Sequence, residues 1–131
     1  MKRYLTFLFL FVLSSNTIIA QDLDTNSSTK VDLLIGNWKI DLRPTPESEA
    51  YYQFFVVKEI NENTFTGTFY GSEIKNGIIN QNWSKLYFAF STADQSNDYY
   101  HSGYLENGKV YGITYCPNRG FTNPWIGTLE L

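Results

Sequence analysis

Apolar and polar residues alternate in short runs along the chain from about residue 33 onward. In the run 35–43, the apolar residues Trp38, Ile40 and Leu42 occupy even positions, whereas the odd positions between and after them hold the charged residues Lys39, Asp41 and Arg43. Such a period of two predicts strands with one buried face, because successive side chains of a strand point to opposite sides of its sheet. No comparable stretch carries the 3.6-residue period of an amphipathic helix. The pattern therefore predicts an all-β protein.

Eight runs have the length of a strand and are separated by residues that favour turns. The predicted strands are 35–43, 52–60, 64–71, 73–80, 85–92, 99–105, 109–116 and 124–131. Outside the first run, the inward-facing residues predicted most clearly are Phe65, Gly67, Phe69, Leu86, Phe88, Phe90, Trp125, Gly127, Leu129 and Leu131.

Two runs leave an alternative open. The run 73–80 contains Asn76-Gly77, which is itself a hairpin signal, so the sequence does not decide between one strand and two. The run 52–60 is apolar on both faces. Its inward-facing set is therefore either Tyr52, Phe54 and Val56 or Phe55 and Val57.

Residues 1–20 have the features of a secretory signal peptide. Lys2 and Arg3 precede an apolar run at 5–12, and the segment ends at the small residue Ala20. Polar residues interrupt the run well before the roughly 20 apolar residues that a membrane-spanning helix needs. We therefore expect a secreted or periplasmic protein without a membrane span.

The remaining residues divide into a leader and one domain. Residues 21–32 are mostly polar and predict a flexible leader, and residues 33–131 have the length of a single domain. Removing the signal peptide leaves eight basic and thirteen acidic residues, a net charge of −5, with no basic cluster. Nucleic acids and anionic membrane surfaces are therefore not expected as partners.

The strand pattern also predicts how the sheet closes. Consecutive antiparallel strands can form an eight-stranded up-and-down (meander) barrel, which has no free sheet edge. The connections 44–51, 93–98 and 117–123 are long, whereas 61–63, 81–84 and 106–108 are short. Because connections in a meander alternate between the two ends, we expect a tight floor and a looped mouth. A barrel of this size either holds one small ligand or is filled by side chains, and the sequence leaves both open.

Short motifs support the barrel. They are GNW at 36–38, FTGTFYGS at 65–72 and an aromatic-led closing strand at 124–131. Together they resemble the calycin barrels, the lipocalin-like and avidin-like families. The resemblance implies a barrel that holds a small molecule and whose floor is plugged by Trp38. Avidins contact biotin through polar residues at positions that match Ile40, Phe69 and Gly71, which cannot form those hydrogen bonds, so biotin is not implied.

A candidate ligand site lies at the predicted mouth. Arg43 and Arg119 are the only arginines after the signal peptide, and the barrel places both at this end, near Phe121 and Trp125. Two guanidinium groups beside aromatic rings suit a carboxylate, phosphate or sulfate. The alternative is that the arginines are solvated or form ion pairs. The candidate ligand-binding residues are Trp38, Arg43, Phe69, Phe88, Phe90, Tyr104, Arg119, Phe121 and Trp125.

The sequence shows no catalytic or metal-binding constellation. His101 and Cys116 are the only residues of their kinds, so neither a metal cluster nor an internal disulfide is expected, and no cofactor is predicted. We expect His101 to be exposed or capped and Cys116 to be a small buried apolar residue.

Three functions remain under consideration. The favoured one is a non-enzymatic, lipocalin-like barrel that binds a small, partly apolar ligand at its looped end, with an anionic group as one option. A barrel enzyme of the isomerase, cyclase or decarboxylase type is the second, with Tyr100 or Tyr104 beside Arg43 in the cavity. A secreted inhibitor or other module that binds a protein partner is the third.

Overall fold

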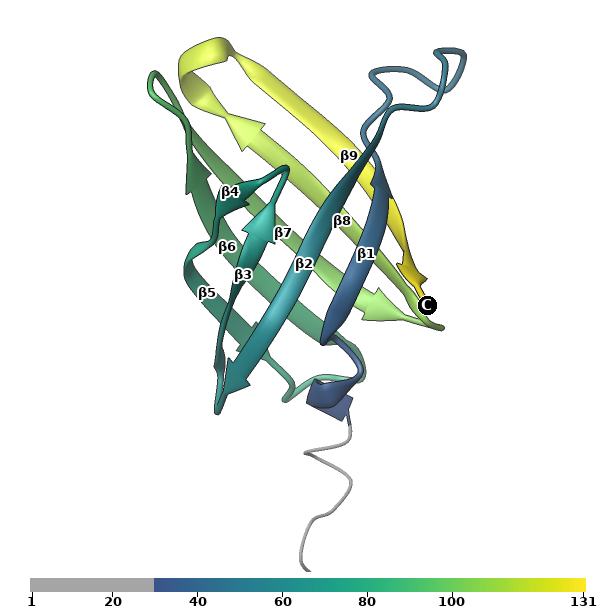
Figure 1. Cartoon of the computed structure of the whole chain (residues 1–131), viewed down its shortest axis with the longest axis vertical. Helices are drawn as coiled ribbons and strands as arrows, with labels where there is room; N and C mark the ends of the chain where they lie inside the picture. Colours follow the sequence, from purple (N-terminus) through teal and green to yellow (C-terminus); the bar gives the residue numbers. More distant parts are fainter. Residues whose placement is uncertain (1–29) are drawn as a thin grey trace, which may run out of the picture.

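The structure of the protein, a computed structural model, describes residues 30–131 (Figure 1). Its strands are β1 (Gly36–Asp41), β2 (Tyr52–Asn61), β3 (Thr64–Phe69), β4 (Ser72–Glu73), β5 (Lys75–Asn80), β6 (Leu86–Ala93), β7 (Asp98–Glu106), β8 (Lys109–Cys116) and β9 (Phe121–Glu130). A 3-10 turn, η1 (Pro117–Arg119), joins β8 to β9, and a helical turn at 30–32 precedes β1. The predicted signal peptide and the greater part of the predicted leader lie outside the described residues.

The strands form one closed, antiparallel sheet. Strands that follow one another in the chain are paired, except that β4 and β5 each pair with β3 rather than with each other. β1 also pairs with β9, which joins the two ends of the meander. The short strands β4 and β5 together occupy the fourth place, so the barrel has eight strands. The all-β class and the eight-stranded up-and-down barrel are therefore confirmed.

The fourth predicted strand is interrupted, but the hairpin signal is not the cause. The break lies at Ile74, between β4 and β5. Asn76 and Gly77 lie within β5, where the register against β6 shifts between Lys75 and Ile78. Asn76 adopts the left-handed backbone conformation there, with φ of 52°. These two residues thus form an irregularity in a continuing strand rather than a turn between two strands.

The inward faces follow the predicted parity over most of the barrel. The residues confirmed as buried include Trp38, Ile40, Phe65, Phe69, Leu86, Phe88, Phe90 and Trp125. In β2, Phe55 and Val57 face inward, which decides the open alternative. Leu129 and Leu131 are corrections, since Leu129 is 40% exposed and Leu131 is fully exposed. Leu129 lies beyond the last pairing of β9 with β8, at Lys109 and Thr128, so only β1 flanks it, and Leu131 follows the end of β9.

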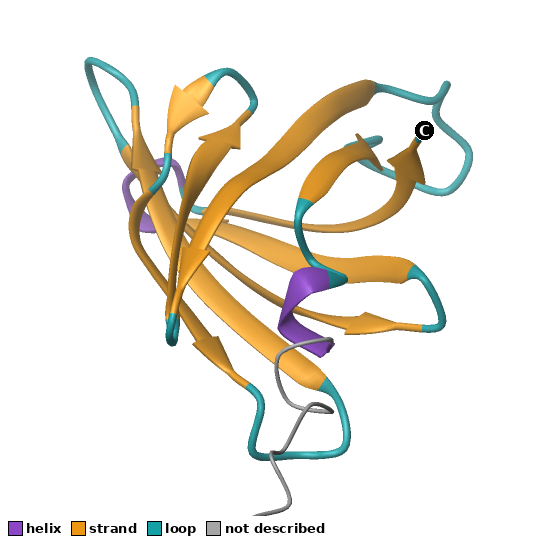
Figure 2. Cartoon of the chain, turned by 60° about the horizontal axis from the view of Figure 1, so that its bottom comes forward, coloured by secondary structure: helices purple, strands orange, loops and turns teal. Residues whose placement is uncertain are grey.

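The floor of the barrel is closed by the segment before β1. Val31 and Leu34 are buried, and the indole Nε1 of Trp38 donates a hydrogen bond to the carbonyl of Leu34 at 2.8 Å. Lys30 also reaches the β5–β6 connection, where its Nζ donates to the carbonyl of Trp83 at 2.9 Å. Figure 2 shows the helical turn at this end of the barrel. Residues 30–32 of the predicted leader are therefore part of the floor.

The opposite end is the looped mouth. The connections after β1, β6 and β8 lie there, together with the short β3–β4 turn, at the top of Figure 1. Cys116, at the end of β8, is buried as a free thiol, as expected. Within residues 30–131 no helix is long and apolar enough to cross a membrane.

Candidate functional site: a cavity at the barrel mouth

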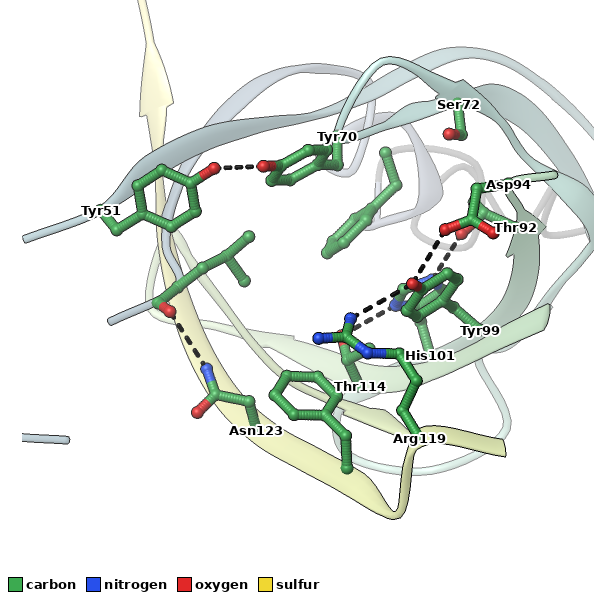
Figure 3. Close-up of a pocket in the computed structure, with 13 residues that line it drawn as sticks. Tyr51, Tyr70, Ser72, Thr92, Asp94, Tyr99, His101, Thr114, Arg119 and Asn123 are labelled. Carbon is green, nitrogen blue, oxygen red and sulfur yellow. Dashed lines mark hydrogen bonds between the residues drawn. The ribbon is translucent and has the colours of Figure 1, made fainter. Parts of the chain in front are cut away.

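The interior is packed in its middle and hollow at its mouth. Phe55 lies at the centre of the packed part, where its ring stacks on Phe90 at a centroid distance of 5.1 Å and contacts Trp125 edge-on. Above this layer is a cavity of about 670 Å³, a size typical of small-molecule sites. It is lined by Leu42, Tyr51, Phe69, Tyr70, Ser72, Thr92, Asp94, Tyr99, His101, Thr114, Arg119, Phe121 and Asn123 (Figure 3).

The base of the cavity is built around His101. The β-sheet register places His101 between Phe90 on β6 and Thr114 on β8, and the ring stacks on Phe90 at 4.6 Å. Thr92 Oγ1 lies 2.9 Å from Nε2, and Thr114 Oγ1 lies 2.9 Å from Nδ1. The side chain is only 3% exposed, and this burial lowers the pKa of His101 to about 4. The imidazole is therefore neutral at pH 7 and is held by two hydroxyl groups.

Trp125 connects the hydrogen-bonded side chains of Thr92, His101 and Thr114 to the packed layer beneath them. Its Nε1 donates a hydrogen bond to Thr114 Oγ1 at 3.0 Å. The indole lies directly against Gly112 of β8, where a Cβ would come within 2.2 Å of Cζ2 of Trp125. The glycine thus makes room for the indole, and the indole supports one of the two threonines that hold His101.

One side of the mouth is formed by two tyrosines. The hydroxyl groups of Tyr51 and Tyr70 are hydrogen-bonded to each other, which joins the β1–β2 connection to the β3–β4 turn (Figure 3). This bond raises the pKa of Tyr70. Tyr70 and Gly71 both have positive φ, 53° and 78°, as required in a type I′ hairpin turn. The turn therefore fixes Tyr70 where it meets Tyr51.

The opposite side carries the charged groups. Arg119 Nη1 donates to the hydroxyl of Tyr99 at 3.2 Å, and this hydroxyl donates to Asp94 Oδ2 at 3.0 Å (Figure 3). The other oxygen of Asp94 accepts the backbone N–H groups of Ser96 and Asn97, and these bonds lower the pKa of Asp94. Both carboxylate oxygens are thus engaged within the protein.

Arg119 also lies beside an aromatic ring, with its guanidinium carbon 5.1 Å from the centroid of Phe121. The 3-10 turn that carries Arg119 ends at Gly120, which has the left-handed conformation of a helix cap, with φ of 58°. This turn directs the chain back into β9 and leaves the arginine at the rim of the cavity.

The structure brings together part of the predicted ligand site. Phe69, Arg119 and Phe121 line the cavity. The rings of Phe88, Phe90 and Trp125 belong to the packed layer beneath it, and Trp38 lies at the floor.

Arg43 and Tyr104 do not line the cavity. Arg43 forms an ion pair, which is the alternative that the sequence left open. Its Nε donates a hydrogen bond to Asp41 Oδ2 at 2.7 Å, and this bond lowers the pKa of Asp41. Tyr104 is on the outer face of β7, stacked on Tyr111 with a centroid distance of 5.2 Å. The ammonium group of Lys85 lies over the ring of Tyr104. The two arginines therefore do not form a pair in the cavity.

Sequence reasoning did not select most of the polar lining. The residues it missed are Tyr51, Tyr70, Ser72, Thr92, Asp94, Tyr99, His101, Thr114 and Asn123. One signal was available for His101, because its parity is opposite to that of the outward-facing Tyr100, Ser102 and Tyr104. Following that parity through β7 would have placed Tyr99 and His101 inside the barrel.

The described residues, 30–131, contain no group of three or more His, Cys, Asp or Glu side chains that could hold a metal ion. No protein-family model, curated protein or solved structure matches the chain. The function is therefore argued from the cavity itself.

Proposed function

We propose that the protein is a secreted or periplasmic, lipocalin-like carrier or receptor of a small, partly apolar molecule that has an anionic group. The observation that carries the proposal is the cavity of about 670 Å³, with aromatic walls, a neutral polar base and one guanidinium at its rim. A few polar groups in a partly apolar cavity are typical of small-molecule sites, where they fix the orientation of the ligand.

The anionic group is inferred from Arg119. A guanidinium has five N–H donors, and the hydrogen bond to Tyr99 uses only one of these. The ion pairs formed among residues 30–131 do not include Arg119, and both oxygens of the nearby Asp94 accept other hydrogen bonds. Arg119 therefore retains donors for a carboxylate, sulfonate or phosphate.

The apolar part of the ligand is inferred from the walls. Leu42, Phe69 and Phe121 supply apolar surface, and the paired rings of Tyr51 and Tyr70 extend one wall toward solvent. A flat or ring-containing molecule would bury its apolar surface against these side chains while its anionic end stays at the rim.

A barrel enzyme is the second candidate, and Tyr99 is the observation that favours it, because its hydroxyl lies between Asp94 and Arg119. The sequence suggested Tyr100 or Tyr104 as the tyrosine of such an enzyme, but both lie on the outer face of β7. His101, with a pKa of about 4, is a weak base at neutral pH, and both of its ring nitrogens contact threonines rather than a carboxylate. Binding is therefore the better supported function.

The experiment compares two fluorescent probes that differ mainly in charge. 8-Anilinonaphthalene-1-sulfonate carries a sulfonate, and N-phenyl-1-naphthylamine has the same rings without it. We expect one molecule of either probe to bind per chain. Arg119→Ala should weaken the sulfonate probe about five- to tenfold, the value of a charge-assisted hydrogen bond at a partly exposed site, and leave the neutral probe within twofold.

Lys58→Ala is the matched control, because it removes an exposed cation from the outside of β2. It should leave the affinity for both probes unchanged. Failure of both probes to bind the folded wild-type protein would overturn the proposal. Equal weakening by Arg119→Ala and Lys58→Ala would show a general charge effect and remove Arg119 from the site. For the location, N-terminal sequencing of the protein from its host should begin at Gln21.

A further inference from the structure

The polar base of the cavity has a fixed number of hydrogens to share. Thr92, His101, Thr114 and Trp125 form a chain of three hydrogen bonds, Thr92 to Nε2 of the ring, Nδ1 to Thr114, and the indole N–H to Thr114. With a neutral imidazole these groups hold four polar hydrogens: two hydroxyl hydrogens, one ring N–H and the indole N–H. Three hydrogens form the three bonds, so one hydroxyl hydrogen remains.

The tautomer of His101 decides which threonine keeps that hydrogen. If Nδ1 carries the proton, Thr114 accepts from both the ring and the indole, and its own hydroxyl hydrogen is the one that remains. Thr92 then donates to Nε2 and has only lone pairs left. In this state Thr114 is a donor toward the cavity and Thr92 is an acceptor.

The other tautomer reverses these roles. With the proton on Nε2, Thr92 accepts from the ring and keeps its hydroxyl hydrogen. Thr114 donates to Nδ1, accepts from Trp125 and retains one lone pair. In both states one threonine offers a hydrogen and the other can accept one, and both line the cavity.

We infer that the base of the cavity recognises an uncharged amide group of the ligand, which accepts a hydrogen bond from one of Thr92 and Thr114 and donates one to the other. An amide carries an acceptor oxygen and donor N–H groups on a single neutral group. It can therefore match the one donor and the one acceptor that the two threonines offer in either tautomer. This inference rests on the proposed function, since it assigns the buried end of the same ligand.

A charged group fits the base poorly. The charged side chains that line the cavity, Asp94 and Arg119, are both exposed at the rim, whereas Thr92, His101 and Thr114 are at most 5% exposed. A carboxylate at the base would lose its hydration without gaining a cation as partner, which is unfavourable. The remaining hydroxyl hydrogen can be accepted by a neutral carbonyl oxygen, which carries no charge to desolvate. The expected ligand is thus polar but uncharged at its buried end.

The test uses benzamide and acetophenone, which differ only in NH₂ against CH₃, so that the second lacks the donor. His101 is the only histidine, so the ring nitrogens of ¹⁵N-histidine-labelled full-length protein report binding at the base without ambiguity. Titration at pH 7 should shift both ring signals with either compound. Benzamide should bind about fivefold more tightly, the value of one additional neutral hydrogen bond.

Threonine-to-valine variants then assign the preference to the base. Thr92→Val removes one hydroxyl at nearly constant shape and should bring the preference for benzamide close to one. Thr114→Val should do the same. Because Thr114→Val also removes the acceptor for Trp125, the conclusion depends on Thr92→Val and on the wild-type comparison. Thr122→Val, on the exposed face of β9, is the matched control and should retain the preference.

The outcomes separate this inference from the proposed function. Equal affinity of the wild-type protein for the two compounds, or an unchanged preference in Thr92→Val, would overturn the amide assignment. Binding of the sulfonate probe through Arg119 would still stand in that case. Failure of benzamide, acetophenone and both fluorescent probes to bind would overturn both.

Discussion

The buried neutral ring of His101 makes the stability of the protein depend on pH. In the unfolded chain His101 has its ordinary pKa of 6.5, whereas in the folded protein burial lowers the pKa to about 4. Between these values the unfolded chain binds the proton and the folded protein does not. The free energy of unfolding is therefore highest above pH 6.5 and falls as the pH is lowered from 6.5 toward 4.

The size of the effect follows from the two pKa values. They differ by about 2.5, and one pKa unit corresponds to about 1.4 kcal/mol, so the complete effect is about 3 kcal/mol. Between pH 7 and pH 5 the unfolded histidine becomes almost fully protonated while the folded one stays neutral. This interval should account for a loss of about 2 kcal/mol.

Urea denaturation at pH 7, 6 and 5 measures this loss. In the wild-type protein the free energy of unfolding should decrease by about 2 kcal/mol, with most of the decrease below pH 6.5. His101→Gln retains a polar side chain without a titratable ring and should lose the greater part of this dependence. Asp41 and Asp94, whose pKa values are lowered, contribute mainly below pH 4 and leave the interval to His101. An equal decrease in wild type and His101→Gln would refute the reasoning.

Three further variants test the floor, the packed layer and the mouth. Trp38→Phe removes the buried hydrogen bond to Leu34 and some packing, and should lower the free energy of unfolding in urea by about 2 kcal/mol. Gly112→Ala places a Cβ against Trp125, and should cost about 2 kcal/mol in the same assay and weaken both fluorescent probes by displacing the indole. Arg43→Ala should change the free energy of unfolding little, because ion pairs exposed to solvent contribute little to stability. It should change the affinity for the sulfonate probe less than twofold, because Arg43 is paired with Asp41 and does not line the cavity.

Each of these variants has an informative contrary result. Ser102→Ala, on the exposed outer face of β7, is the control for Gly112→Ala and should change neither stability nor probe binding. A neutral effect of Gly112→Ala would mean that the indole does not lie against β8. Full stability of Trp38→Phe would contradict its role in closing the floor. Loss of the sulfonate probe in Arg43→Ala would restore the arginine pair that the sequence suggested.

The fold was predictable because a half-buried strand leaves a local record in the sequence. Trp38 and Ile40 alternate with charged residues, and this alternation survives in the structure. The predictions about the strands were wrong where the structure depends on a neighbouring strand rather than on the local sequence. Leu129 has the correct parity, but β8 stops before it and leaves it exposed. Asn76 and Gly77 are a strong turn signal that the sheet absorbs as an irregularity in β5.

The polar base was harder to predict because it depends on register between strands. Thr92, His101 and Thr114 come from β6, β7 and β8, and each is unremarkable in its own segment. Only the pairing of these strands places both threonines at the two nitrogens of the ring. The position of Arg43 was missed for the opposite reason, because Asp41, only two residues away, binds its side chain.

The central claim is that a small molecule occupies the mouth cavity. Native mass spectrometry of the protein purified from its host tests it most directly, with Ser72→Trp to fill the cavity and Ser102→Trp as an outer-face control. We predict one bound small molecule per chain in the wild type and in Ser102→Trp, and none in Ser72→Trp. A wild-type protein without a bound molecule, or a molecule retained equally in Ser72→Trp, would contradict the claim.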